Sequence, residues 1–151
     1  MKAKGIRILD KINRVVSVKL QDILKEISNG NLLYWSILHF YGSGVLKNEK
    51  SIEVLEEEAN KSEKGFFLTW DDLNELANDL WEIEDMLVIG SKKQEKIIRH
   101  KIDQDMYESC DIVIEMFDSC YWEVFSSDEA LINRLATKFK HTIFLKPNFE
   151  K

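Results

Sequence analysis

Residues 117–126, FDSCYWEVFS, place a cysteine and two carboxylates among aromatic side chains. A thiolate is a nucleophile and a nearby carboxylate can move protons, so Asp118, Cys120 and Glu123 raise the hypothesis of an active site. Neither Cys120 nor the earlier Cys110 has a histidine at a spacing that belongs to a known nucleophile motif. A free cysteine in an apolar strand is usually a small buried hydrophobe, and we expect Cys120 to be one.

Pairing across the hairpin separates its two strand carboxylates. Two strand-forming runs flank residues 118–119, which predicts a two-residue turn with Cys120 opposite Phe117. Because side chains alternate between the faces of a strand, this register puts Glu115 and Glu123 on opposite faces. The same register puts the two cysteines at opposite ends of the hairpin, too far apart for a disulfide within it. We therefore expect sheet core here and no paired catalytic carboxylates.

Metal-ligand spacing occurs once, at residues 103–108. Asp103, Asp105 and Glu108 form a DxD cluster that could hold a divalent ion. An EF-hand loop counted from Asp103 fails, because its sixth position is Glu108 and its twelfth is Ile114, where Gly and Glu are required. The histidines share no zinc-binding spacing; they are His39, His100 and His141. We assign no metal, no cofactor and no catalytic residue.

Length and composition predict one globular domain over residues 1–151. The hydrophobic share is 44% and the charged share 32%, and with one proline and six glycines no linker divides the chain. No apolar run approaches the roughly 20 residues of a membrane span, and the first residues carry no secretory pattern. The expected location is the cytoplasm, with no membrane partner.

Acidic residues are concentrated in two segments. Residues 65–91 and 102–133 contain no Lys or Arg, yet they hold seven and nine of the 27 acidic residues. Such a charge distribution attracts cationic partners and repels phosphate backbones, so direct nucleic-acid binding is not expected. A solvated surface without a partner is the alternative, because segments of a sequence need not form one patch.

Periodicity predicts an α+β or α/β fold, with a mixed sheet covered by three to four helices. The expected strands lie at about 6–9, 32–41, 65–68, 86–89, 111–126 as a hairpin, and 142–146. The expected helices lie at about 17–28, 51–62 and 70–82, with a last one that follows a capping box of Ser126 and Glu129. Residues 103–109 are expected to be a connection.

The helix at 70–82 is the best candidate for a binding surface. Thr69 suits its N-cap, and its polar face carries a row of acids. Trp70, at the start of this helix, is the tryptophan that we expect to be exposed, while the other three are expected in the core. The candidate partner-binding residues are Trp70, Asp71, Asp72, Glu75 and Asp79, together with Asp103, Asp105 and Glu108.

Residues 110–140, CDIVIEMFDSCYWEVFSSDEALINRLATKFK, resemble a group of small bacterial proteins. They are similar to immunity proteins of contact-dependent growth inhibition and related polymorphic toxin systems. The similarity lies in a hairpin with a YWEVFS-like strand, a capping Ser-Asp-Glu and an amphipathic helix before a last strand. It implies a cytoplasmic protein without catalysis of its own, which binds one cognate toxin domain. Many such toxins are nucleases with basic surfaces.

Two other classes of function stay open at this point. One is a small metal-dependent hydrolase or nuclease that uses Asp103, Asp105 and a histidine. The other is a homodimeric adaptor that associates through its aromatic strands. The oligomeric state is not predicted.

Overall fold

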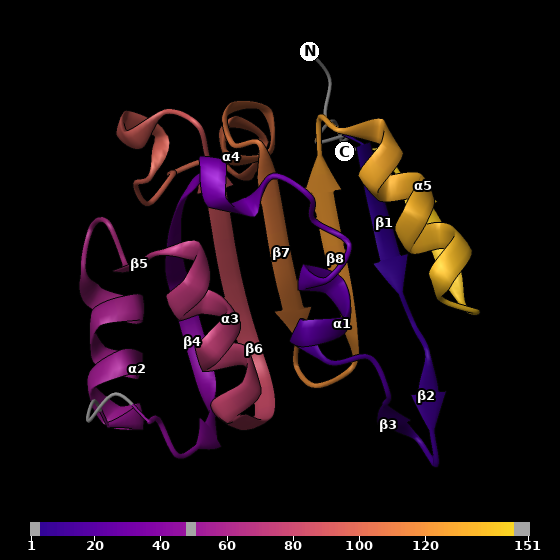
Figure 1. Cartoon of the computed structure of the whole chain (residues 1–151), viewed down its shortest axis with the longest axis horizontal. Coiled ribbons are helices and arrows are strands. Elements are labelled where there is room, and N and C mark those ends of the chain that lie inside the picture. Colours follow the sequence, from indigo (N-terminus) through magenta and orange to yellow (C-terminus); the bar gives the residue numbers. More distant parts are fainter. Residues whose placement is uncertain (1–3, 48–50, 147–151) are drawn as a thin grey trace.

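The computed structural model describes residues 4–47 and 51–146 (Figure 1). Seven strands form one antiparallel sheet in the order β5-β4-β6-β7-β8-β1-β9. These strands are β1 (Lys4–Ile8), β4 (Tyr34–Gly44), β5 (Phe66–Leu68), β6 (Leu80–Ser91), β7 (Ile112–Phe117), β8 (Tyr121–Ser126) and β9 (Thr142–Leu145). A separate small hairpin consists of β2 (Lys11–Ile12) and β3 (Val15–Val16).

Five α-helices lie in the described part of the chain, and the expected α+β class is confirmed. They are α1 (Leu20–Leu24), α2 (Ile52–Lys61), α3 (Trp70–Asp79), α4 (Asp103–Ser109) and α5 (Glu129–Lys138), with short 3-10 turns η1 (Gly30–Leu32) and η2 (Gln94–Lys96). Helix α4 stands where a connection was expected, and α3 ends three residues early because β6 already begins at Leu80.

One face of the sheet, here called the first face, is covered by α1, α2, α3 and α5 (Figure 1). Its core contains Trp35 and Trp122, which are fully buried as expected. Each indole N–H donates to a backbone carbonyl, of Gly30 and Val18 respectively, at 2.8 Å. The two largest core side chains therefore leave no polar atom unpaired, and each contributes roughly 2–3 kcal/mol by burial.

The second face is covered over part of its area by residues 92–111, which include α4. A smaller apolar cluster forms there, in which Tyr107 stacks on Phe125 with the ring centres 4.1 Å apart. The remaining members of this cluster are Leu38, Ile89, Ile97, Met106, Cys110 and Val113. Burial raises the pKa of the Cys110 thiol to about 12, so this cysteine is a neutral core residue.

The register of the β7–β8 hairpin differs from the prediction by one residue. Asp118 and Ser119 both have left-handed backbones, with φ of 47° and 56°, and the Cys120 N–H donates to the Phe117 carbonyl at 2.7 Å. Cys120 is then an extra residue, so Phe117 pairs with Tyr121. A shift of one residue moves every following side chain to the other face of the strand.

This shift overturns two predictions. Glu115 pairs directly with Glu123 on the second face, so the prediction that these carboxylates diverge is wrong. Cys120 lies in the turn and is exposed, so the prediction that it is buried is also wrong. Both cysteines are free.

Arg99 joins the segment that covers the second face to the rest of the fold. Its guanidinium donates to the carbonyls of Leu38, Ala59 and Ser62, and its backbone N–H donates to the Glu63 carbonyl. We expect Arg99→Ala to lower the free energy of unfolding by about 3 kcal/mol, because three carbonyls lose a charged donor. Arg99→Lys should lose less, since one ammonium still reaches some of them.

Urea denaturation measures this difference. Lys101→Ala, which removes an exposed cation two residues away, serves as the control and should change stability by less than about 0.5 kcal/mol. Equal stability of the Arg99→Ala and Lys101→Ala variants would show that Arg99 does not hold this segment in place.

Candidate protein-binding site

Helix α3 presents part of the predicted acidic face. The Thr69 hydroxyl oxygen accepts from the Asp72 N–H at 3.1 Å, which is the expected N-cap. Asp71, Asp72 and Glu75 are exposed, because the apolar side of the helix packs into the first-face core. The acids of its first turn also complement the helix dipole.

Asp79 is not part of that surface. It ends the helix and is 6% exposed, and its carboxylate accepts from the Lys47 N–H at 3.0 Å. The side chain therefore fixes the segment that follows β4, so its predicted place on the exposed acidic face is wrong.

Helix α2 is a second acidic helix on this face of the sheet. It carries four glutamates against one lysine, and it packs beside β4 on the same face of the sheet as α3 (Figure 1). We name the exposed carboxylates of the two helices the acidic helical surface. Its members are Glu53, Glu57, Glu58, Asp71, Asp72 and Glu75. The sequence showed each helix as acidic, but only the sheet topology shows that they cover the same strand.

The exposed tryptophan is Trp81, which corrects the prediction for Trp70. Trp70 is half-buried and stacks on Trp35, with ring centres 5.2 Å apart. Its ring fits against Gly30, where a Cβ would lie 2.3 Å from it. Trp81 was expected on the apolar side of a longer helix; because α3 ends at Asp79, it belongs to a strand and is 74% exposed.

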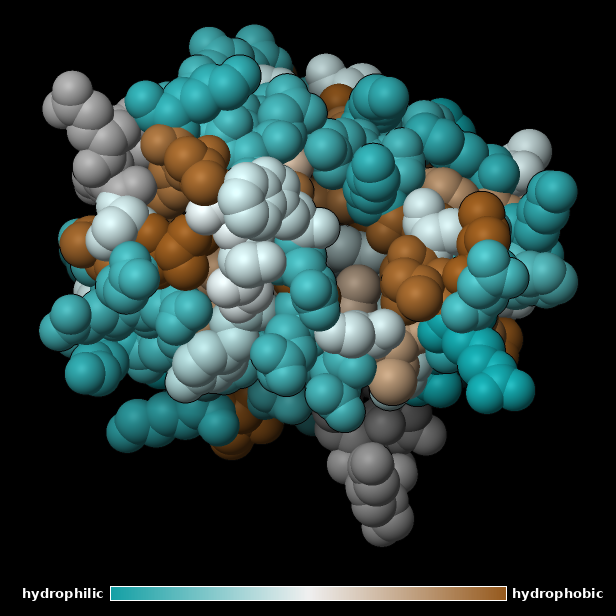
Figure 2. All heavy atoms as spheres, turned by 90° about the horizontal axis from the view of Figure 1, so that it is seen from below, coloured by the Kyte–Doolittle hydropathy of each residue, from teal (hydrophilic) through white to brown (hydrophobic). Residues whose placement is uncertain are grey.

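A groove of about 760 Å³ opens beside Trp81. It lies between α1, β3 and the start of β6, and the buried Met116 and Trp122 contribute to its lining. Figure 2 views this end of the molecule and shows apolar side chains beside a hollow among hydrophilic ones. Glu82 and Glu84 follow Trp81 and are exposed. An exposed aromatic side chain, a groove and the carboxylates of Glu82 and Glu84 thus lie together beyond the C-terminal end of α3.

The acids of α4 lie elsewhere. Asp103, Asp105 and Glu108 are exposed, but α4 packs Met106 and Tyr107 against the second face, whereas α3 packs against the first. The structure therefore does not bring the two predicted acidic sets together. Among residues 4–47 and 51–146, no three His, Cys, Asp or Glu side chains gather at metal-binding distance.

The pair Glu115 and Glu123 forms a second cluster of charge, on the second face. Arg7 lies across from Glu123 on β1, and its Nε and Nη2 both approach one Glu123 carboxylate oxygen at 2.7 Å. The Arg7 guanidinium also lies 4.5 Å from the centre of the Tyr121 ring. Glu123 is thus paired with a cation, whereas Glu115 accepts a hydrogen bond from the Tyr107 hydroxyl at 3.3 Å.

The pKa of Glu115 is raised to about 7, chiefly by burial and also by the nearby carboxylates of Asp103 and Glu123, while the hydrogen bond from Tyr107 lowers it. Like charges directly opposite on neighbouring strands are unfavourable, so a proton on Glu115 relieves this pair. The sequence contained both glutamates, but only the hairpin register reveals that they meet.

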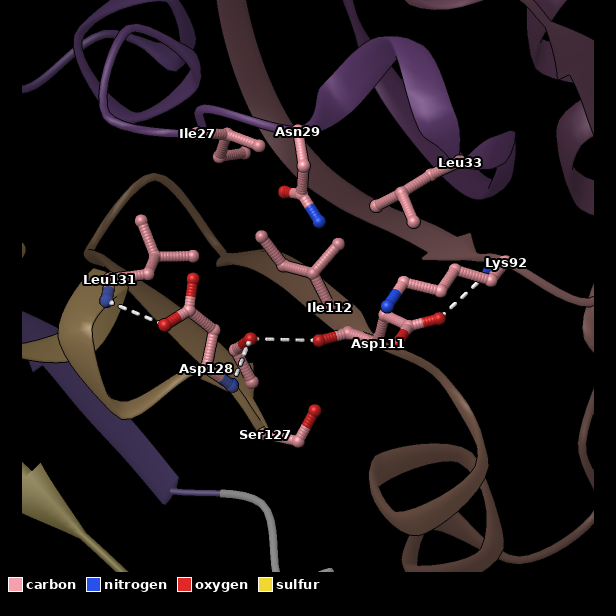
Figure 3. A pocket seen from close by; sticks show the side chains of 10 residues that line it. Ile27, Asn29, Leu33, Lys92, Asp111, Ile112, Ser127, Asp128 and Leu131 are labelled. Atoms are coloured by element: carbon pink, nitrogen blue, oxygen red, sulfur yellow. Dashed lines mark hydrogen bonds between the residues drawn. The ribbon is translucent and has the colours of Figure 1, made fainter.

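A smaller pocket of about 270 Å³ lies near the start of α5 (Figure 3). Its two aspartates already have structural partners. Asp128 accepts from the N–H groups of Ala130 and Leu131 at 3.1 and 3.3 Å, and Asp111 accepts from the Lys92 N–H at 2.7 Å. The N-cap of α5 is therefore Asp128, which corrects the predicted capping box of Ser126 with Glu129.

Comparison of the chain with protein-family models, with curated proteins and with solved structures gives no match. The resemblance of residues 110–140 to immunity proteins therefore stays a prediction. In the described part of the chain, no helix is long and apolar enough to span a membrane.

The raised pKa of Glu115 predicts a specific pH dependence of stability. An acid whose pKa is higher in the folded than in the unfolded state stabilises the fold at low pH, and that stability is lost as pH rises through about 7. Glu115→Gln cannot ionise. We expect it to be more stable than the wild type by less than about 1 kcal/mol at pH 5 and by about 3 kcal/mol at pH 8.5.

Urea unfolding at the two pH values measures this effect. Glu108→Gln, on the exposed side of α4, is the matched control and should follow the wild-type dependence on pH. The assignment fails if the difference between Glu115→Gln and the wild type is the same at pH 5 and pH 8.5.

Proposed function

We propose that this chain is a bacterial immunity protein, which acts in the cytoplasm by binding and neutralising a cognate toxin domain with a basic surface, such as a nuclease. The observation that carries the proposal is Trp81, a 74% exposed tryptophan beside a groove and just after the acidic helix α3. The resemblance of residues 110–140 supplies the class of partner. Under this proposal the chain needs no catalytic residue and no cofactor.

Charge and burial have different roles in such a complex. Exposed carboxylates on α2 and α3 attract a basic domain over distances of about 10 Å, which raises the rate of association. Most of the binding free energy then comes from a few desolvated side chains, and tryptophan is among the commonest of these. If the inhibitor covers the nucleic-acid-binding surface of a nuclease, the nuclease is inhibited and the inhibitor needs no catalytic activity.

The acidic helical surface is tested by charge reversal. The double substitution Asp71→Lys and Asp72→Lys should slow association with the cognate toxin domain by about tenfold at low salt. It should also flatten the salt dependence, because the attraction that salt screens has been removed. Stopped-flow or surface plasmon resonance measures both quantities.

The matched control makes the same charge change on the other face of the sheet, with Asp103→Lys and Asp105→Lys. We expect it to leave most of the association rate intact. If both double variants slow association equally, net charge alone governs the encounter, and the acidic helical surface is not the binding surface.

Trp81 is tested by truncation. Trp81→Ala should weaken binding to the same toxin domain by about 30-fold or more, mainly through faster dissociation. Phe67→Ala is the control, because Phe67 is also exposed but lies on the edge strand β5. Calorimetry should show unchanged affinity for the control; unchanged affinity for Trp81→Ala as well would remove Trp81 from the interface.

A further inference from the structure

Strand β9 is an edge of the seven-stranded sheet, at the end opposite β5. It pairs with β1, with Ile143 opposite Arg7 and Phe144 opposite Ile6. No described strand lies on its other side. Edge strands of stable proteins are normally protected, because their unpaired backbone groups can bind another strand.

The backbone groups of β9 that face outward follow from its pairing. The Leu9 N–H donates to the His141 carbonyl at 2.8 Å, so residue 141 directs its backbone groups toward β1. Hydrogen bonding alternates along an antiparallel strand, so residues 143 and 145 also face β1. The N–H and C=O groups of Thr142 and Phe144 therefore point to the open edge, spaced as a partner strand requires.

The side chains of β9 offer apolar contacts on both faces. Ile143 shares the face of Arg7 and is 49% exposed, while Phe144 shares the face of Ile6 and is 64% exposed. An extended segment added to this edge would cover the outer side of both. Edge strands are protected from such pairing by being short or by carrying charges or a proline; β9 is short, but Thr142–Leu145 contains no charge and no proline.

The residues around this edge are basic, whereas the net charge of the chain as a whole is negative. Residues 130–146 contain no Asp or Glu, although the chain as a whole has a net charge of −6. Lys140 and Lys146, at the two ends of β9, are exposed. Lys138 is paired with Glu26, and Asp10 accepts from the N–H groups of Lys140 and His141, so those carboxylates are already engaged.

We propose that the β9 edge is a binding site for an extended, acidic segment of another protein, which adds an eighth strand to the sheet. The open backbone groups require a strand, and the lysines at both ends select one that carries carboxylates. A second copy of this chain fits poorly, because antiparallel pairing of two β9 strands would bring lysines of one copy near those of the other. This site lies at the far end of the sheet from Trp81 and does not depend on the proposed function.

The test uses the full chain labelled with ¹⁵N and three synthetic eight-residue peptides. One alternates Glu with Val, the second has Lys in place of Glu, and the third is the acidic peptide with alternate backbone nitrogens methylated. We expect the acidic peptide to shift the amide signals of Thr142 and Phe144 and to bind about tenfold more tightly than the Lys peptide. The methylated peptide should not bind, because it cannot complete the ladder.

A charge-swapped chain supplies the decisive control. The double substitution Lys140→Glu and Lys146→Glu changes only exposed side chains, and it should invert the preference so that the Lys peptide binds more tightly. Equal binding of the two charged peptides, shifts confined to other parts of the sheet, or no binding would each overturn the proposal. So would concentration-dependent shifts of the same amides without peptide, because these would identify a second copy as the occupant.

Discussion

The register of the β7–β8 hairpin determines which side chains enter the core and which carboxylates meet. These strands occupy the middle of the sheet, between β6 and β1, so their alternation sets the composition of both faces. The turn is fixed from a neighbouring strand: the Asp118 N–H donates to the Asp85 carboxylate at 3.0 Å, and the Ser119 N–H donates to the Glu84 carbonyl at 2.8 Å. With the turn held in this way, Trp122 points into the first-face core and Glu123 to the second face.

Local patterns in the sequence predict most elements but not their exact ends. Amphipathic spacing and the Thr69 cap identify α3, and the apolar alternation of residues 112–126 identifies a hairpin. The end of α3 could not be predicted, because residues 80–82 continue its amphipathic pattern but pair with β4 as part of β6. That tertiary competition explains why Trp81 is exposed.

The register of the β7–β8 hairpin could not be predicted from the sequence, for a different reason. The positions of its strands and turn could be predicted, but a bulge of one residue at Cys120 depends on backbone geometry that the sequence does not specify. Because of this bulge, Glu115 and Glu123 face each other, and the pKa of Glu115 is raised to near neutrality. The sequence thus shows which residues are acidic, but which of them lie close together depends on the sheet topology and the hairpin register.

The two charged regions of the molecule lie at opposite ends of the sheet. Helices α2 and α3 carry exposed carboxylates on the side of the sheet that contains β4, whereas lysines flank β9 at the other edge. The electrostatic potential therefore differs in sign between the two ends of the sheet. A basic partner is attracted toward one end and an acidic segment toward the other. Under the proposed function, we therefore expect the toxin domain to contact α3 and the start of β6 and to leave β9 and α4 free.

Hydrogen–deuterium exchange of the chain, alone and with its cognate toxin domain, tests that arrangement most directly. We expect slower exchange in the complex over residues 70–84, with no change over α4 or β9. Protection confined to α4 and the second face, with α3 and the start of β6 exchanging as in the free chain, would contradict it.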